Sequence, residues 1–455
     1  GFSITIDSFI SPIPYFYAIA ILVIMFGARH LYFSISKLNF KTAPLVFMSP
    51  RGLISILLFL QLEALNDVNL KTNIIDERVL LLVILLSMLI MLLGTLKKRD
   101  KIKDIPLEIE IPINEDLNTD YYNDEKNDWN MYPLNRNRRL RSSQTIRDLV
   151  RETSLSNNDF IVPIFAVEGM NIKNEILSMP GYFQLSLDLI EKEVAQLWRM
   201  GLKAVLVFVK VEDKLKDNRG KEALNKDGLM QRAIKTIKNS VPEMLVFTDV
   251  ALDPYSKFGH DGIVENFKIL NDQTIDLLAQ ISVSHANAGS DFVAPSDMMD
   301  GRVLKIRQAL ENNGHKNTGI ISYSAKYASS LYGPFRNALD SAPEFGDKKT
   351  YQMDYANQKE ALNEALKDVD EGADIIMIKP GLPYLDIIWR VKEKFGLPTF
   401  AYNVSGEYSM IRFAAEAGAL DLNNVMLETL ISFKRAGCNG VLTYFAIDAA
   451  RQLNS

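Results

Sequence analysis

Residues 319–336 read GIISYSAKYASSLYGPFR. The first four residues form a short β-branched run that predicts a buried strand, and Lys326 follows among small, apolar and aromatic neighbours with no carboxylate close by in the sequence. A second segment, IIMIKPG (375–381), has the same design: an apolar run, then Lys379, then a Pro-Gly turn. Two lysines therefore each follow a predicted buried strand.

Further apolar runs surround these two segments in the C-terminal part of the chain. The full set is FIVPIF (160–165), AVLVFV (204–209), MLVFTD (244–249), DFVA (291–294), GIIS (319–322), DIIMI (374–378), PTFAY (398–402) and GVLTY (440–444). Amphipathic stretches that predict helices lie between them, for example at 187–201, 273–289, 358–372 and 425–437. This alternation is typical of an α/β fold, and we predict a (β/α)8 (TIM) barrel. A doubly wound sheet is the alternative, but no glycine-rich phosphate loop follows the first strand.

The barrel interpretation also predicts where a functional site lies, because chemistry in such barrels occurs at the C-terminal ends of the strands. The side chains at or just after these ends are Asp249, Ser296, Asp297, Lys326, Lys379, Tyr402, Ser405 and Tyr444. We therefore expect both lysines at one mouth of the barrel. A single lysine at a strand end is more often a surface residue with its ammonium in water, so the pair carries the prediction.

Two adjacent buried lysines indicate a particular chemistry. Loss of hydration disfavours the charged form of an amine and lowers its pKa, and a second ammonium nearby lowers the pKa further. The neutral amine is then a nucleophile toward ketones and forms a Schiff base. The pattern predicts a Schiff-base enzyme with a carbonyl substrate. A class I aldolase is an alternative that explains one lysine but not two.

Composition excludes several other functions. The chain has 455 residues, a formal net charge of −5 and one cysteine. The charge gives no indication of a nucleic-acid partner. The single cysteine, Cys438, excludes a disulfide framework and any zinc site built from several cysteines.

The N-terminal region, residues 1–96, differs from the rest of the chain in its hydropathy. Its apolar runs at 12–28, 43–62 and 79–96 predict transmembrane helices, and the last of these would extend about 27 Å as a helix. Buried helices of a globular domain are the alternative. The basic segment LKKRDKIK that follows predicts that everything C-terminal to it is cytoplasmic. An acidic linker at 97–130 then precedes a basic segment that begins at Met131.

Five segments in the C-terminal part resemble the porphobilinogen synthase (5-aminolevulinate dehydratase) family. They are TDVALDPYSKFGHDG, VAPSDMMDGR, SYSAKYASSLYGPFR, IIMIKPGLPYLDI and AYNVSGEYSM, in this order along the chain. The resemblance extends from about Met131 to the C-terminus. It implies a catalytic barrel at 158–455 that condenses two 5-aminolevulinate molecules to porphobilinogen with loss of two waters, in tetrapyrrole and heme biosynthesis. It also implies a homo-octamer in which a basic N-terminal arm, residues 131–157, wraps a neighbouring barrel.

The same resemblance assigns roles to individual residues. Lys379 would form the Schiff base with the substrate that becomes the propionate side of the product, and Lys326 would hold the other substrate. The residues that would contact the substrates are Asp249 and Ser296 at the amino group, Arg336, Lys348 and Gln352 at one carboxylate, and Ser405 and Tyr444 at the other. Tyr332 and Phe335 are either walls of the site or ordinary core residues. The family often has arginine where this chain has Lys348, and lysine keeps the charge but loses the bidentate geometry.

The segment DVALDPYSKFGHDG (249–262) bears on metal binding. Zinc-dependent members of the family have three cysteines here, whereas this chain has Ala251, Asp253 and Asp261. Carboxylates do not favour tetrahedral zinc, so we expect no catalytic zinc and treat the two aspartates as candidate ligands for a hard cation. His260 is either a ligand or an ordinary lid residue. Glu364 matches the family's allosteric magnesium carboxylate and predicts Mg²⁺ as cofactor.

SPRGLISILLFLQL (49–62) resembles the closing helices of bacterial cation/proton antiporters. We interpret the chain as a fusion, or a read-through gene model, in which such helices precede a complete synthase that begins at Met131. The N-terminal segment would then lie in the inner or plasma membrane and the catalytic part in the cytoplasm. The alternative function is an antiporter fragment whose barrel senses a ligand without catalysis.

Overall fold

The computed structural model describes residues 16–17, 19–20 and 135–454. The chain divides into two compact units, Gly1–Asp128 and Trp129–Ser455, and the second contains nearly all of the described residues. Apart from residues 16, 17, 19 and 20, the predicted membrane segments and the antiporter-like motif lie outside the described residues. Within the described ranges, no helix combines the length and the apolar character that a membrane span requires.

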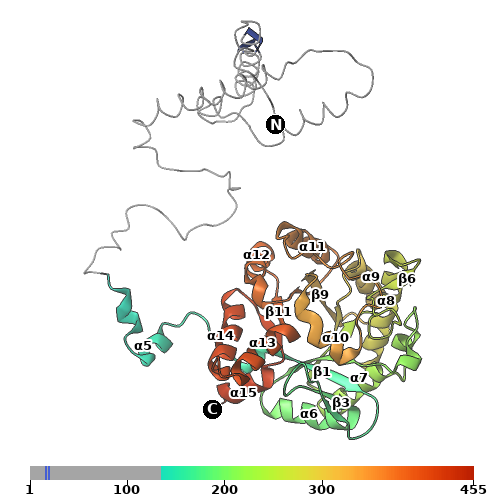
Figure 1. Cartoon of the computed structure of the whole chain (residues 1–455). Helices are drawn as coiled ribbons and strands as arrows, with labels where there is room; N and C mark the ends of the chain where they lie inside the picture. The colour runs from blue at the N-terminus through green and yellow to red at the C-terminus, as the bar shows by residue number, and fades with distance from the viewer. Residues whose placement is uncertain (1–15, 18, 21–134, 455) are drawn as a thin grey trace. The chain divides into compact units, whose positions relative to one another are not determined.

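Eight parallel strands form a closed barrel, which confirms the predicted (β/α)8 fold (Figure 1). The sheet order is β12-β11-β10-β9-β8-β5-β4-β1, and β12 pairs with β1 to close it. The barrel strands are β1 (Phe160–Val167), β4 (Ala204–Val209), β5 (Leu245–Val250), β8 (Phe292–Pro295), β9 (Gly319–Lys326), β10 (Ile375–Lys379), β11 (Thr399–Asn403) and β12 (Gly440–Thr443). Each of the eight predicted runs therefore contributes one strand.

Helices surround the barrel and cover the outer faces of its strands (Figure 1). They are α6 (Leu187–Arg199), α7 (Leu229–Ser240), α8 (Asn271–Ala288), α9 (Arg302–Asn312), α10 (Gly333–Leu339), α11 (Lys359–Asp370), α12 (Leu385–Phe395), α13 (Ser405–Glu416), α14 (Leu422–Arg435) and α15 (Ala446–Leu453). Because helices cover one face and the barrel interior the other, every residue of β1, β9 and β10 is buried. This explains why the apolar runs in β1 and β10 are continuous rather than alternating.

Two hairpins were not predicted. Strands β2 (Lys173–Glu175) and β3 (Phe183–Ser186) pair with each other, and β3 also pairs with the C-terminal half of β1. The second hairpin joins β6 (Ile263–Glu265) and β7 (Lys268–Leu270). These strands are only three or four residues long, and most of their residues are at least partly exposed, so they have no apolar run to indicate them.

Strand β9 is longer than its apolar run predicted. The run ends at Ser322, but the strand continues to Lys326, which lies opposite Lys379 of β10. Small and aromatic residues (Tyr323, Ser324 and Ala325) continue the buried strand where the β-branched residues stop. Lys326 is therefore the last residue of a strand and not part of the loop after it.

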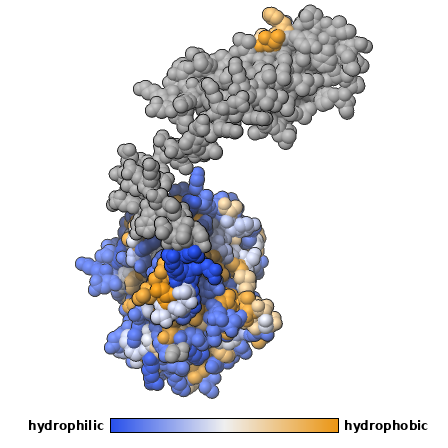
Figure 2. Space-filling model, turned by 90° about the vertical axis from the view of Figure 1, so that its left-hand side faces the viewer, coloured by the Kyte–Doolittle hydropathy of each residue, from blue (hydrophilic) through white to orange (hydrophobic). Residues whose placement is uncertain are grey.

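The described part of the predicted arm consists of short helices. A 3-10 helix, η4 (Asn137–Arg141), precedes α5 (Gln144–Leu149), and neither contains a buried residue. A further 3-10 turn, η5 (Asn157–Asp159), leads into β1. Leu140, Leu149 and Val150 are exposed, with Leu149 79% accessible. In Figure 2, the visible face of the described region is mostly hydrophilic, with hydrophobic residues in small separate groups.

Candidate active site

The two lysines lie side by side at one end of the barrel. Lys326 ends β9 and Lys379 ends β10, and the two residues are register partners in the parallel ladder. Both are buried, at 6% and 5% accessibility. The structure thus brings together the two residues on which the predicted chemistry depends, because the C-terminal ends of adjacent parallel strands meet at the same rim.

Lys379 has an aromatic environment. Its Nζ atom lies 4.7 Å from the ring centre of Tyr402, 5.0 Å from Phe335, and 5.1 Å from both Tyr323 and Tyr332. Burial, and then the positive charge of Lys326, lowers its pKa to about 7, although nearby aspartates act in the opposite direction. A substantial fraction of this amine is therefore neutral near pH 7.

Lys326 has a polar environment, contrary to the expectation from its sequence neighbours. Its Nζ lies 3.4 Å from an oxygen of Asp261 and donates a hydrogen bond to the main-chain oxygen of Ser296. The carboxylate partner comes from the loop after β5, far away in the sequence. The two lysines share a design in sequence but differ in their charged neighbours.

Asp261 also fixes the loop that follows α10. Lys348 Nζ lies 2.6 Å from Asp261 and 3.5 Å from Asp253. Burial would raise the pKa of Asp261, but Lys326 and Lys348 outweigh it and lower that pKa to about 2. The two aspartates in turn raise the pKa of Lys348, despite its burial. A chain of opposite charges therefore connects Lys326 to the loop through one carboxylate.

His260 provides a second connection between the same two segments. Its Nδ1 lies 3.1 Å from the Tyr351 hydroxyl, and its Nε2 lies 3.0 Å from the main-chain oxygen of Phe345. Both ring nitrogens are thus engaged by residues of the loop after α10. This arrangement agrees with a lid histidine and leaves neither nitrogen free to ligate a metal ion.

Asp249, at the end of β5, is buried near both lysines. Burial and the charge of Asp253 raise its pKa to about 7, although Lys379, the Ser296 hydroxyl and Lys326 act in the opposite direction. A carboxyl group with this pKa can give or take a proton near neutral pH. Ser296 itself is 4% accessible and follows directly after β8.

The residues expected to bind one carboxylate lie near the same loop. Arg336, in α10, is partly buried, and within residues 135–454 its guanidinium makes no ion pair. Gln352 is 4% accessible, and its Oε1 has no hydrogen-bond partner among the described residues. Arg336 and Lys348 therefore offer positive charge to a carboxylate, whereas the free Gln352 Oε1 can only accept a hydrogen bond.

Ser405 and Tyr444, expected at the other carboxylate, make contacts within the protein. The Ser405 hydroxyl accepts a hydrogen bond of 3.0 Å from the main-chain nitrogen of Phe335, and the Tyr444 hydroxyl lies 2.6 Å from that of Tyr402. Tyr332 donates to the main-chain oxygens of Tyr327 and Lys379, at 2.7 and 3.1 Å. Tyr332 and Phe335 thus both face Lys379, as walls of its environment.

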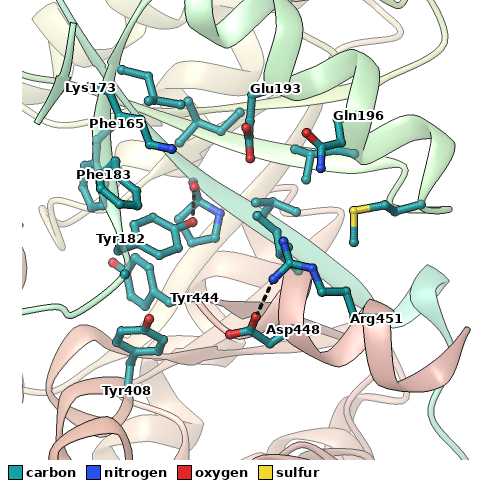
Figure 3. A pocket seen from close by; sticks show the side chains of 18 of the residues that line it. Phe165, Lys173, Tyr182, Phe183, Glu193, Gln196, Tyr408, Tyr444, Asp448 and Arg451 are labelled. Carbon is teal, nitrogen blue, oxygen red and sulfur yellow. Dashed lines mark hydrogen bonds and ion pairs between the residues drawn. The ribbon is translucent and has the colours of Figure 1, made fainter. Parts of the chain in front are cut away.

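Tyr444 also borders a cavity of about 300 Å³ on the flank of the barrel (Figure 3). Its ring packs at 4.9 Å and nearly perpendicular to that of Tyr182, whose hydroxyl donates to the main-chain oxygen of Pro163. The polar lining includes Glu193 and Arg451, and Arg451 pairs with Asp448 at 3.0 Å. Neither Lys326 nor Lys379 lines this space, which adjoins the site described above only through Tyr444 and its neighbours.

Sequence reasoning missed Glu407, which supports the turn after Lys379. This residue of α13 is fully buried and accepts hydrogen bonds from the main-chain nitrogens of Gly381 and Leu382, both at 3.1 Å. Its other oxygen accepts from Asn403 at 2.7 Å. Burial raises the pKa of Glu407 to about 8, against these hydrogen bonds. The signal in the sequence was a glutamate in the otherwise small and uncharged segment NVSGEYS.

The residues predicted as cation ligands differ in how freely they can bind a metal ion. Asp253 and Asp261 already share the ammonium of Lys348, so these carboxylates do not present a free set of donors for a metal ion. Glu364, in α11, pairs with Lys367 at 2.9 Å and borders a cavity of about 740 Å³ that is also lined by Asp300 and Glu360. Within the described ranges, no three His, Cys, Asp or Glu residues cluster closely enough to hold a metal by themselves. A hydrated magnesium ion is bound through only one or two carboxylates, and Glu364 would have to give up its contact with Lys367 to hold one.

Comparison with known proteins identifies the family. Residues 134–452 match the delta-aminolevulinic acid dehydratase family. The dehydratase of Synechococcus elongatus is 51% identical over 327 residues, which cover 71% of this chain and 100% of that protein. The Bacillus subtilis enzyme is 51% identical over 320 residues, 70% of this chain and 98% of its own length. The chain belongs to the delta-aminolevulinic acid dehydratase family.

A solved dehydratase agrees with this assignment. The enzyme of Toxoplasma gondii, in complex with the reaction product porphobilinogen, has a TM-score of 0.69 and 48% identity, and the match covers 70% of this chain and 91% of that one. The family membership confirms the resemblance found in the sequence from about Met131 onward.

Proposed function

We propose that this chain is a porphobilinogen synthase that condenses two 5-aminolevulinate molecules and releases two waters. The observation that carries the proposal is the register pairing of Lys326 and Lys379, two buried amines at one mouth of the barrel. Two ketones need two nucleophiles, and holding both substrates side by side converts their encounter into an intramolecular step. A non-catalytic, ligand-sensing barrel is not favoured, since it would not require both lysines and Asp249.

The environments of the two lysines suggest a division of labour. The neutral fraction of Lys379 makes it the first nucleophile, and the surrounding rings would stabilise the positive iminium that it forms. Lys326 would hold the second substrate, with its carboxylate at Arg336, Lys348 and Gln352. Asp249 would give or take the proton that moves between the two bound substrates.

The direct test is turnover. Purified full-length chain supplied with 5-aminolevulinate should produce porphobilinogen, and Lys379→Met should not. If the wild-type chain is folded but makes no porphobilinogen, the proposed function is wrong.

Magnesium and the octamer are further parts of the proposal. One carboxylate, Glu364, would hold hydrated Mg²⁺ and thereby support the closed site, and no catalytic zinc is expected. After treatment with a chelator, added Mg²⁺ should restore activity in the wild type but less in Glu364→Gln, and recovery with zinc alone would contradict this. The exposed apolar residues of the arm, such as Leu149, support packing of η4 and α5 on a second copy. Light scattering should then give the mass of eight chains.

The membrane segment remains a prediction from the sequence. A fusion predicts an intact species near 51.4 kDa in the membrane fraction. A product that begins at Met131 and is absent from membranes would contradict it.

A further inference from the structure

Tyr323 lies close to both lysines, and the predictions from sequence did not include it. Its ring centre lies 5.1 Å from Lys379 Nζ and 5.9 Å from Lys326 Nζ. The residue is fully buried, and its hydroxyl has no hydrogen-bond partner among the described residues. An unsatisfied buried hydroxyl destabilises the folded state, so its presence beside two amines points to a partner that binds there.

An irregularity of β9 places Tyr323 in the interior. Ser322 lies opposite Ile376 of β10, and Ala325 lies opposite Ile378, so β9 contains one extra residue at this point. Residues three apart on a regular strand face opposite sides, but this bulge allows Tyr323 and Lys326 to face the same side.

The contacts of Ser322 show which face of β9 points to the helices and which points to the barrel interior. Its hydroxyl accepts from Arg302 of α9 at 3.0 Å and donates to Asp368 of α11 at 2.6 Å, so it points outward to the helices. Tyr323, the next residue, points inward to the lysines and packs edge-on against Tyr402 at 6.5 Å. Bulges near active sites commonly redirect a side chain in this way.

We propose that the Tyr323 hydroxyl is a catalytic hydrogen-bond donor to the ketone oxygen of the substrate at Lys379. As Nζ forms its bond to the carbonyl carbon, the π electrons of the C=O bond move to oxygen, and the proton lost by nitrogen goes to that oxygen. Tyr323 keeps its own proton throughout. The inference rests on the proposed Schiff-base function and adds a residue to it.

Two further features favour this role. Burial raises the pKa of the Tyr323 hydroxyl well above its usual value, and the charge of Asp249 acts in the same direction, so the group stays a donor. The other tyrosines around Lys379 have partners for their hydroxyls: Tyr332 donates to main-chain oxygens, and Tyr402 meets Tyr444. Tyr323 is therefore the hydroxyl of this group that a substrate can engage without breaking an existing contact.

The test compares Tyr323→Phe with Tyr255→Phe. Tyr255 is the matched control, because its hydroxyl is also buried without a described partner, but among residues 135–454 its ring does not lie beside either lysine as that of Tyr323 does. The measurement is the rate at which borohydride traps a 4-oxocarboxylic acid on Lys379, with kcat and KM for 5-aminolevulinate and the Tm of each variant.

Tyr323→Phe should slow trapping and lower kcat by about 100-fold, the usual effect of removing one donor to a developing oxyanion, with little change in KM and no fall in Tm. Tyr255→Phe should trap at the wild-type rate. Wild-type trapping by Tyr323→Phe would overturn the inference. Because the 4-oxocarboxylic acid forms a Schiff base without condensing, this test remains decisive even if the chain makes no porphobilinogen.

Discussion

Lys326 and Lys379 are register partners on adjacent strands, yet their surroundings differ. Four aromatic rings lie within 5.1 Å of Lys379 Nζ, whereas Lys326 lies beside Asp261, which in turn pairs with Lys348 of the loop. Burial alone favours a neutral amine, and a carboxylate favours a charged one. Two equivalent positions in a barrel can thus serve different steps, according to what the neighbouring loops place beside them.

The largest expected effect distinguishes the lysines by substitution. Lys379→Met and Lys326→Met should each lower turnover by at least about a thousandfold, because each removes a nucleophile. Their adducts should differ. Lys326→Met should still be trapped by borohydride with one substrate at Lys379, whereas Lys379→Met should show little adduct at Lys326. Equal trapping at both lysines would remove the proposed difference between them.

Asp261 should contribute more to the stability of the fold than Asp253. Asp261→Asn leaves two buried ammonium groups without their shared carboxylate, and breaking such a pair costs about 3–5 kcal/mol. Asp253→Asn removes a longer contact of 3.5 Å and leaves Asp261 in place beside Lys348, so it should cost less than Asp261→Asn. Urea unfolding of both variants measures the difference. If both variants lose the same stability, the charge chain through Asp261 is not what holds the loop.

The pH dependence of adduct formation should reveal the coupling between the lysines. Lys379 has a pKa of about 7, below that of an ordinary lysine, so its reactive neutral form increases as pH rises through 7. The rate of Schiff-base formation should rise with pH over that range. The same shift makes the folded state bind fewer protons than the unfolded state between pH 7 and about 10.5. The free-energy cost of burying the Lys379 ammonium therefore falls, and the stability of the fold rises, as pH increases over this window.

Removing the charge of Lys326 should raise the pH midpoint of Schiff-base formation at Lys379. In Lys326→Met, the pKa of Lys379 loses the lowering effect of a neighbouring ammonium, and we expect the midpoint of the rate profile to move to higher pH. An unchanged midpoint would mean that burial alone sets the pKa of Lys379.

The smallest effect concerns the main chain that carries Lys379. Tyr332→Phe removes two hydrogen bonds, one of them to the main-chain oxygen of Lys379, and should lower the free energy of unfolding by about 1–2 kcal/mol. Chemical denaturation at a fixed pH measures this loss. A variant as stable as the wild type would show that packing of the Tyr332 ring, and not its hydroxyl, holds this part of the site in place.

Local patterns predicted the barrel and the meeting of the lysines, because strand runs are local in sequence and parallel strands share an end. They did not predict the partner of Lys326. Asp261 lies 65 residues from Lys326 and 87 from Lys348, so only the folded chain brings these charges together. The bulge in β9 was hidden for a similar reason, since a change in register depends on the neighbouring strand. The N-terminal predictions concern residues outside the described part of the chain.

The central claim is that Lys379 is the first nucleophile toward 5-aminolevulinate. Borohydride reduction of the wild-type chain near pH 7 with one equivalent of 5-aminolevulinate, followed by peptide mapping, tests it most directly. The account predicts a stable adduct on the peptide that contains IIMIKPG, at Lys379. An adduct at Lys326 alone, or at neither lysine, would contradict it.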